Sequence, residues 1–174
     1  IIGYVLIMKR IVLLSWILLS VGYTFAEKHW QTHFSYNSVQ QIAMDKDEVY
    51  ALANGKMFSV NQKTEHLTLF TNFSGLHGTE IVQLAYDDVS EQLLIFYSDG
   101  KLDILHNKKV KYVADLYNKQ ITSSKRCNNV TFKGNMAYLS MDFGILTFDI
   151  EEYKFVDTYY IAPEAKEVKV TDIM

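Results

Sequence analysis

The sequence predicts an all-β protein of the β-propeller class, and three observations predict it. An apolar, β-prone hairpin unit occurs three times, with the marker glycines Gly55, Gly100 and Gly144 spaced 45 and then 44 residues apart. A repeat of roughly 40–50 residues made of short strands is typical of a propeller blade. Aromatic residues make up 14% of the chain and proline occurs once, which suits β-sheets. The chain is 49% hydrophobic and 21% charged, as expected of a globular fold.

The hairpins are predicted from the residues at their turns. Asn54-Gly55 and Asp99-Gly100 each separate two apolar runs. Such dipeptides supply the two positive-φ positions of a type I′ turn, so both are expected to form tight hairpins. Gly144 is expected in the turn of the third hairpin.

The remaining apolar runs complete four-stranded blades in the order inner, central, central, outer. The expected strands are 39–44, 48–53, 56–60 and 66–70; then 80–86, 92–97, 101–105 and 110–115; then 127–132, 136–141, 145–150 and 155–161. The blades thus span about 39–73, 79–118 and 127–162, and 166–174 is expected to begin a fourth. Closed propellers have about 4–8 blades, so these repeats account for only part of a ring.

The N-terminus predicts an export signal over residues 1–26. Met8-Lys9-Arg10 is interpreted as the true start, with the residues before it spurious. An apolar stretch over 11–21 and a cleavage site after Ala26 follow. The alternative, a membrane anchor, is disfavoured because the apolar run is shorter than the ~20 residues of a membrane span. The mature chain, 27–174, is therefore expected to be exported.

The mature chain opens with a segment that alternates apolar and polar residues from Trp30 to Tyr36. This period predicts a half-buried strand, interpreted as an outer strand that completes the last blade and closes the ring. Three blades and an unpartnered strand cannot close a ring by themselves. The sequence is therefore interpreted as the N-terminal part of a longer propeller, which we expect to aggregate or fail to fold when expressed alone.

No motif assigns catalytic, cofactor-binding or metal-binding residues, and no binding residues are identified. The net charge of −3 and the pI near 5.9 do not suggest nucleic-acid binding. Asp142-Phe143-Gly144 matches a kinase triplet but lies at a predicted hairpin turn. His29 and His33 are four residues apart on an expected strand and lack further zinc ligands. An enzyme would need acidic or histidine side chains on its inner strands.

Other polar groups are expected to have structural roles. The inner strands offer mostly amides, and the single Cys127 is expected to be buried and without a disulfide. The paired carboxylates are interpreted as solvated turn residues, and the basic cluster 108–111 as a solvated hairpin tip. The amides are Gln40, Gln41, Gln83 and Asn129, and the carboxylates are Asp87-Asp88 and Glu151-Glu152.

Several short segments resemble PorZ-type proteins of the Bacteroidetes type IX secretion system. The opening Trp30-Gln-Thr-His-Phe-Ser-Tyr-Asn37 is the most specific of them. The others are Val49-Tyr-Ala-Leu, Ser74-Gly-Leu, Ile95-Phe-Tyr-Ser-Asp-Gly100, Ala137-Tyr-Leu-Ser and Phe143-Gly-Ile. The resemblance covers 27–174, and the propeller repeats are akin to those of two-component regulator sensors.

This resemblance implies a non-enzymatic component of the secretion system, in the periplasm or outer membrane and at the cell surface. It implies partners in the attachment complex, including a sortase-like protease, and handling of anionic lipopolysaccharide to which cargo is linked. Two seven-bladed propellers, a β-sandwich and a sorting domain are expected in the family.

Two alternatives stay open. The first is the periplasmic propeller of a hybrid two-component regulator, which would sense a ligand such as a glycan. The second, an extracytoplasmic propeller enzyme such as a lyase or glycosidase, is the weaker.

Overall fold

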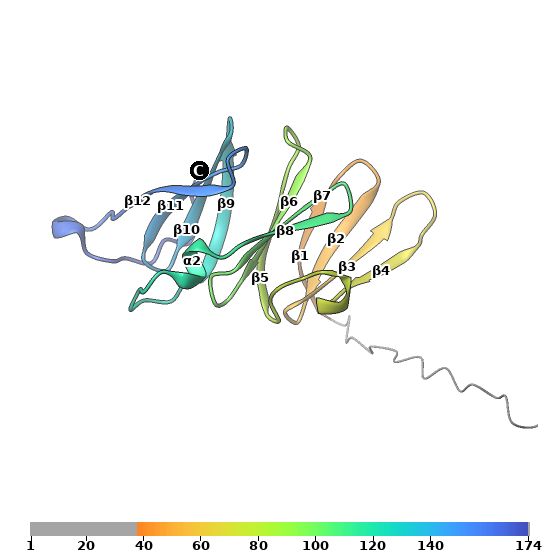
Figure 1. Cartoon of the computed structure of the whole chain (residues 1–174), viewed down its shortest axis with the longest axis horizontal. Helices are drawn as coiled ribbons and strands as arrows, with labels where there is room; N and C mark the ends of the chain where they lie inside the picture. The colour runs from red at the N-terminus through yellow and green to blue at the C-terminus, as the bar shows by residue number, and fades with distance from the viewer. Residues whose placement is uncertain (1–37, 174) are drawn as a thin grey trace, which may run out of the picture. The chain divides into compact units, whose positions relative to one another are not determined.

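The computed structural model describes residues 38–173, in which three four-stranded antiparallel sheets follow one another along the chain (Figure 1). In each sheet the strands are neighbours in chain order. The first blade contains β1 (Val39–Met44), β2 (Glu48–Ala53), β3 (Lys56–Asn61) and β4 (Leu67–Phe70). The second contains β5 (Ile81–Asp87), β6 (Gln92–Tyr97), β7 (Leu102–His106) and β8 (Lys109–Val113). The third contains β9 (Cys127–Lys133), β10 (Met136–Met141), β11 (Gly144–Asp149) and β12 (Lys154–Tyr159).

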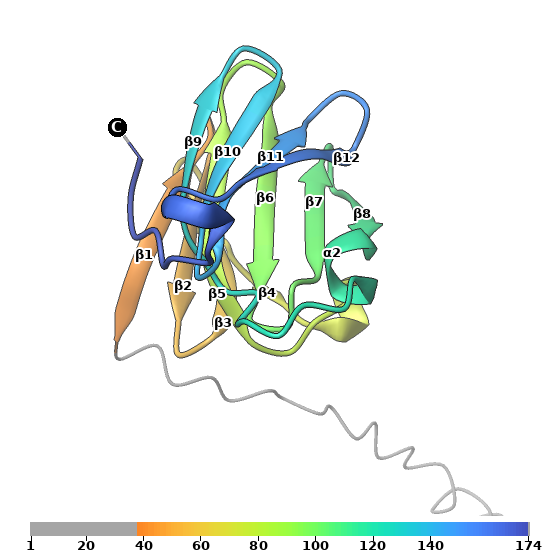
Figure 2. The same ribbon diagram turned by 90° about the vertical axis from the view of Figure 1, so that its left-hand side faces the viewer.

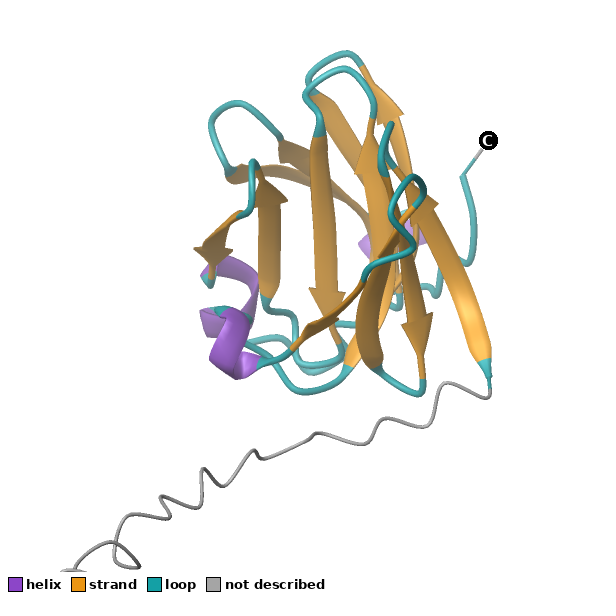
Figure 3. Cartoon of the chain, turned by 90° about the vertical axis from the view of Figure 1, so that its right-hand side faces the viewer, coloured by secondary structure: helices purple, strands orange, loops and turns teal. Residues whose placement is uncertain are grey.

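Short helical segments are confined to the connections between strands, as Figure 3 shows. They are η1 (Asn72–Ser74), α2 (Asp115–Asn118) and η2 (Pro163–Ala165). Within the described range, no helix is long and apolar enough to span a membrane. The strands expected over 39–161 agree with the observed ones to within two residues at each end. The all-β, propeller-type fold is therefore confirmed.

The turn prediction is confirmed for the first hairpin and wrong for the second. Asn54 and Gly55 both have positive φ, at 51° and 72°. At the second hairpin, Gly100 has a φ of 89° but Asp99 does not share the left-handed conformation. The Tyr97 N–H donates to the Lys101 carbonyl at 3.1 Å, so the loop has three residues. A three-residue loop needs the left-handed conformation only at its last position.

A two-residue turn with both φ values positive instead joins β7 and β8. Its residues are Asn107 (φ 48°) and Lys108 (φ 62°). Lysine is not a usual residue for this conformation, so composition alone did not predict the turn. Figure 2 shows the resulting pair β7–β8 beside β6.

Gly144 lies just after the third turn, as the first residue of β11, rather than in it. A Cβ atom at this position would lie 2.5 Å from the Tyr159 carbonyl oxygen. The glycine therefore permits the close approach of β12 to β11. The turn itself consists of Asp142 and Phe143, and the Phe143 ring is buried in the core.

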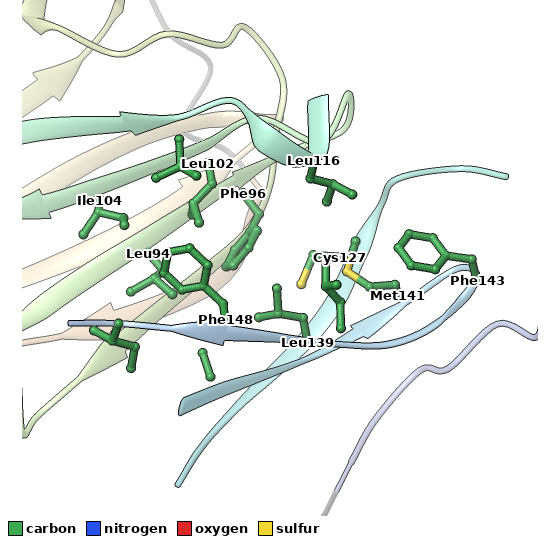
Figure 4. Close-up of a cluster of buried hydrophobic side chains, with 14 residues drawn as sticks. Leu94, Phe96, Leu102, Ile104, Leu116, Cys127, Leu139, Met141, Phe143 and Phe148 are labelled. Carbon is green, nitrogen blue, oxygen red and sulfur yellow. The ribbon is translucent and has the colours of Figure 1, made fainter. Parts of the chain in front are cut away.

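Two clusters of buried apolar side chains join the three blades, and β6 contributes side chains to both of them. Every residue of β6 is buried. Its alternate side chains point to opposite faces. Leu93, Ile95 and Tyr97 join the cluster shared with the first blade. Leu94 and Phe96 join the cluster shared with the third blade (Figure 4). The continuous apolar run in β6 thus reflects burial on both faces.

Residues 166–173 form no strand in the structure but lie along β9. The Val170 N–H donates to the Met141 carbonyl at 2.9 Å, and Asn128 Nδ2 donates to the Val170 carbonyl at 2.8 Å. Thr131 Oγ1 donates to the Ile173 carbonyl at 2.8 Å. Their assignment to a fourth inner strand stays a prediction. The strand expected over 30–36, the export signal, His29 and His33 lie outside the described residues.

The interpretation of the paired carboxylates as solvated turn residues needs one correction. Asp87 is only 5% exposed, because its carboxylate accepts hydrogen bonds from the Ser90 N–H and hydroxyl. Asp88, Glu151 and Glu152 are exposed, as expected. The basic hairpin tip is also exposed, although Lys111 Nζ lies 3.5 Å from the centroid of the Tyr153 ring.

Candidate functional site

The candidate functional site is a cavity of about 530 Å³ at the beginnings of the three inner strands β1, β5 and β9. The β2–β3 turn of the first blade also lines it. β5 contacts both β1 and β9, which brings together segments about 40 residues apart in the sequence. Its lining residues are Gln40, Gln41, Leu52, Asn54, Gly55, Glu80, Ile81, Val82, Gln83, Arg126, Cys127 and Asn128.

Each inner strand has an irregularity at the same place in its blade. The pairing register shifts between Val39 and Gln41 in β1, and between Ile81 and Gln83 in β5. In β9 it shifts where Ser140 and Met141 pair with Asn129 and Cys127. The extra residues are Gln40, Val82 and Asn128, and all three line the cavity. Bulges redirect side chains and are frequent beside functional sites.

The residue after each bulge carries an amide side chain. Gln41, Gln83 and Asn129 occupy equivalent positions, opposite Leu52, Phe96 and Ser140 of the adjacent strands. Gln41 binds the neighbouring inner strand through both amide atoms. Its Nε2 donates to the Leu84 carbonyl at 2.7 Å, and its Oε1 accepts from the Leu84 N–H at 2.9 Å.

Two opposite charges flank the cavity at the residues that precede β5 and β9. Glu80 Oε2 accepts a hydrogen bond from Ser98 Oγ at 2.9 Å. Arg126 is exposed, and its guanidinium forms no ion pair within residues 38–173. The site can therefore bind groups of either charge through its rim and neutral polar groups through its amides.

Cys127 lies in the cavity wall but is not suited to nucleophilic chemistry. The side chain is 1% exposed, and burial raises the pKa of its thiol well above the ordinary value. A thiol kept protonated is a weak nucleophile. The expectation that Cys127 is buried is confirmed. The described residues also contain no group of three or more histidine, cysteine, aspartate or glutamate side chains that could hold a metal ion.

A second polar cluster lies between the first and second blades. Asp103 is fully buried, and its carboxylate accepts from the His77 N–H at 2.7 Å and from the Tyr97 hydroxyl at 2.6 Å. His77 Nδ1 lies 2.8 Å from Asp103 Oδ1, and the ring stacks on Tyr112 with centroids 4.5 Å apart. Burial, followed by the Asp103 contact, raises the pKa of Tyr97. This cluster fixes the segment that crosses between blades.

Sequence reasoning placed amide side chains on the inner strands but did not predict a cavity or assign them a binding role. The amides at positions 40, 41, 83 and 129 were expected on the inner strands, and the first three line the cavity. It missed Glu80 and Arg126, since each directly precedes an inner strand and neither belongs to a motif. Alignment of the blades on their inner strands would have placed both at one mouth of the channel.

These features define the chain as a β-propeller domain, with a polar cavity at the mouth of its inner strands. It belongs to the family described as the N-terminal β-propeller domain of PorZ, of the type IX secretion system, whose model matches residues 49–174.

Comparison with solved structures agrees with this assignment. The chain is 30% identical to PorZ of Porphyromonas gingivalis, with a TM-score of 0.69, over 74% of this chain and 18% of that one. PorZ is described there as an essential bacterial surface component of the type IX secretion system. The chain therefore spans less than a fifth of the length of that protein.

A second similarity concerns the fold alone. The extracellular domain described as that of a hybrid two-component system from B. thetaiotaomicron is 15% identical, with a TM-score of 0.60. The match covers 78% of this chain and 19% of that one. No curated protein shows a significant match to the chain.

Proposed function

We propose that this chain is part of a non-enzymatic, cell-surface component of the type IX secretion system that helps attach secreted cargo to anionic lipopolysaccharide at the outer membrane. The observation that carries this proposal is the match of residues 49–174 to the PorZ N-terminal propeller, together with the 30% identity to a surface component of that system.

In this role the protein acts by binding rather than by chemistry. The propeller contributes a rigid scaffold, because each blade is buried against the next through the clusters around β6. The attachment reaction then belongs to partners in the attachment complex, including a sortase-like protease. The export signal expected over residues 1–26 is consistent with this location.

The experiment is deletion of the gene in its own host, followed by measurement of cargo on the cell surface and in the medium. We expect cargo to lose its surface attachment, and the full-length gene supplied in trans to restore it. Cargo that stays attached in the deletion strain would contradict the proposal.

A second measurement tests the non-enzymatic role. Purified full-length protein, mixed with cargo and lipopolysaccharide without the protease, is expected to form no covalent conjugate. The sensor alternative rests only on a shared fold at 15% identity, so we do not propose it.

A further inference from the structure

Of the three equivalent amide side chains that follow the bulges, Gln83 is the one without a hydrogen bond to another described residue. Its side chain is only 8% exposed and lines the cavity, yet its amide has no partner within residues 38–173. The equivalent Gln41 is satisfied at both amide atoms by Leu84. The Gln83 amide is not among the fully buried, unsatisfied polar atoms of the described residues, so it faces the open cavity and is accessible to a ligand. This arrangement is favourable when a ligand supplies the missing partners.

The charged residues at the rim of the cavity restrict which charged groups a ligand can carry. Glu80 and Arg126 border the same cavity, and no ion pair joins them. An anion alone would be repelled by Glu80, and a cation alone by Arg126. A ligand that carries both charges satisfies both side chains, and an amide group between them satisfies Gln83.

The lining argues against a sugar. None of its twelve residues is aromatic, so the cavity offers no flat face on which a sugar ring can stack. Its volume of about 530 Å³ lies within the usual range for small-ligand sites, roughly 300–1,000 Å³.

We propose that this cavity binds a short zwitterionic peptide. Arg126 receives the carboxylate, Glu80 receives the ammonium group, and Gln83 pairs with a peptide amide. The three bulges position these groups, since they lie at the same level of β1, β5 and β9. The peptide site is independent of lipopolysaccharide attachment, so either proposal can fail without the other.

The test is calorimetric titration of the full-length protein with trialanine carrying free termini. We expect saturable binding that falls about tenfold when the N-terminus is acetylated, and about tenfold when the C-terminus is amidated, because each change removes a charge-assisted hydrogen bond. Maltose, a neutral saccharide of comparable size, is expected not to bind.

Single substitutions of the lining residues test whether trialanine binds in this cavity. Arg126→Gln and Glu80→Gln are each expected to weaken trialanine binding about tenfold. Lys133→Gln is the matched control, because it removes one exposed charge at the opposite end of β9 and should leave affinity unchanged. Gln83→Leu should weaken binding with little change in Tm, because the substitution breaks no hydrogen bond to another described residue. A purely structural Gln83 would instead show a lower Tm.

Three outcomes would overturn the proposal. They are absence of trialanine binding at millimolar concentration, unchanged affinity in Arg126→Gln, or maltose binding at the same site. Loss of cargo attachment in the deletion strain would have no bearing on them.

Discussion

The two interfaces between blades use the same backbone arrangement but different chemistry. Asp103 pairs with Ile95 in the second blade, and Leu146 pairs with Leu139 at the equivalent place in the third. Tyr97 of the second blade is likewise equivalent to Met141 of the third. They pair with Ile81 and Cys127, the first residues of β5 and β9. The first interface therefore holds a buried carboxylate and a hydroxyl where the second holds two apolar side chains.

This difference shows two ways to fix one blade on the next. At the second interface, the fully buried Met141 and Phe148 contribute mainly through apolar burial, which has no strict geometry (Figure 4). At the first, Asp103 fixes the crossing segment through His77, because hydrogen bonds to a charged group are directional. Both interfaces join blades whose inner strands line the cavity.

The largest expected effect is at the apolar interface. Phe148→Ala should lower the free energy of unfolding by about 3–5 kcal/mol, because it leaves a cavity beside Phe155, whose ring centroid is 5.0 Å away. Urea unfolding of the full-length protein, followed at the transition of this propeller, measures the difference. Phe73→Ala is the control, since Phe73 is fully exposed and should change stability by less than about 0.5 kcal/mol. Equal effects of the two variants would refute this account of the core.

The next effect tests packing at the polar interface. A Cβ at Gly78 would lie 2.1 Å from the Tyr97 ring, so Gly78→Ala should cost about 1–3 kcal/mol by overpacking. The φ of Gly78 is not in the left-handed region, so the cost comes from the ring alone. Adding Tyr97→Leu should recover part of the loss in a double-mutant cycle. Strict additivity of the two changes would contradict a direct clash.

The third prediction distinguishes the polar interface from the apolar one by the pH dependence of the free energy of unfolding. The raised pKa of Tyr97 means that the folded state holds the phenol proton longer than the unfolded state. The corresponding stability is present below the ordinary pKa of about 10 and is lost as pH rises above it. Tyr97→Phe should cost about 1 kcal/mol at neutral pH and reduce the alkaline loss.

The control for this pH dependence is Tyr117→Phe, which changes a tyrosine that is 44% exposed. It should change the stability by less than about 0.5 kcal/mol, because it removes a hydroxyl from a largely exposed ring. Tyr50 also has a raised pKa, first through burial and then through Asp45, so some alkaline loss should persist in Tyr97→Phe. If stability fell with rising pH equally in Tyr97→Phe and in the parent protein, Tyr97 would not be a cause of the alkaline loss.

The sequence predicted what is local or periodic and missed what depends on contact between blades. The strands follow from apolar runs and turn residues, and the Asn54-Gly55 turn follows from its dipeptide. The bulges leave no local signature, because they depend on pairing with a neighbour. Arg126 and Glu80 are ordinary charged residues until the fold brings both to one cavity. Asp103 could not be distinguished from a solvated aspartate, because its partner His77 lies 26 residues away.

The smallest expected effect concerns the segment along β9. Asp142 Oδ1 accepts from Asn128 Nδ2 at 2.9 Å and lies 3.4 Å from Lys169 Nζ. Burial raises the pKa of Asp142, but hydrogen bonds from Asn128, Ser124 and Lys169 outweigh it and bring the pKa below its ordinary value. The stabilisation is therefore present above pH ~4 and is lost as pH falls through the folded-state pKa.

Asp142→Asn should accordingly cost at most about 1 kcal/mol, because Lys169 is largely solvated and the Asn128 contact can persist. Hydrogen exchange at the Val170 N–H, which donates to Met141, is the sensitive measurement. The protection factor of this amide should fall in Asp142→Asn and in Lys169→Gln to a similar degree, and acidification through the Asp142 pKa should lower it in the parent chain but not in Asp142→Asn. Unequal effects of the two variants would mean that the ion pair does not hold this segment, and that the backbone contacts of Asn128 and Thr131 suffice.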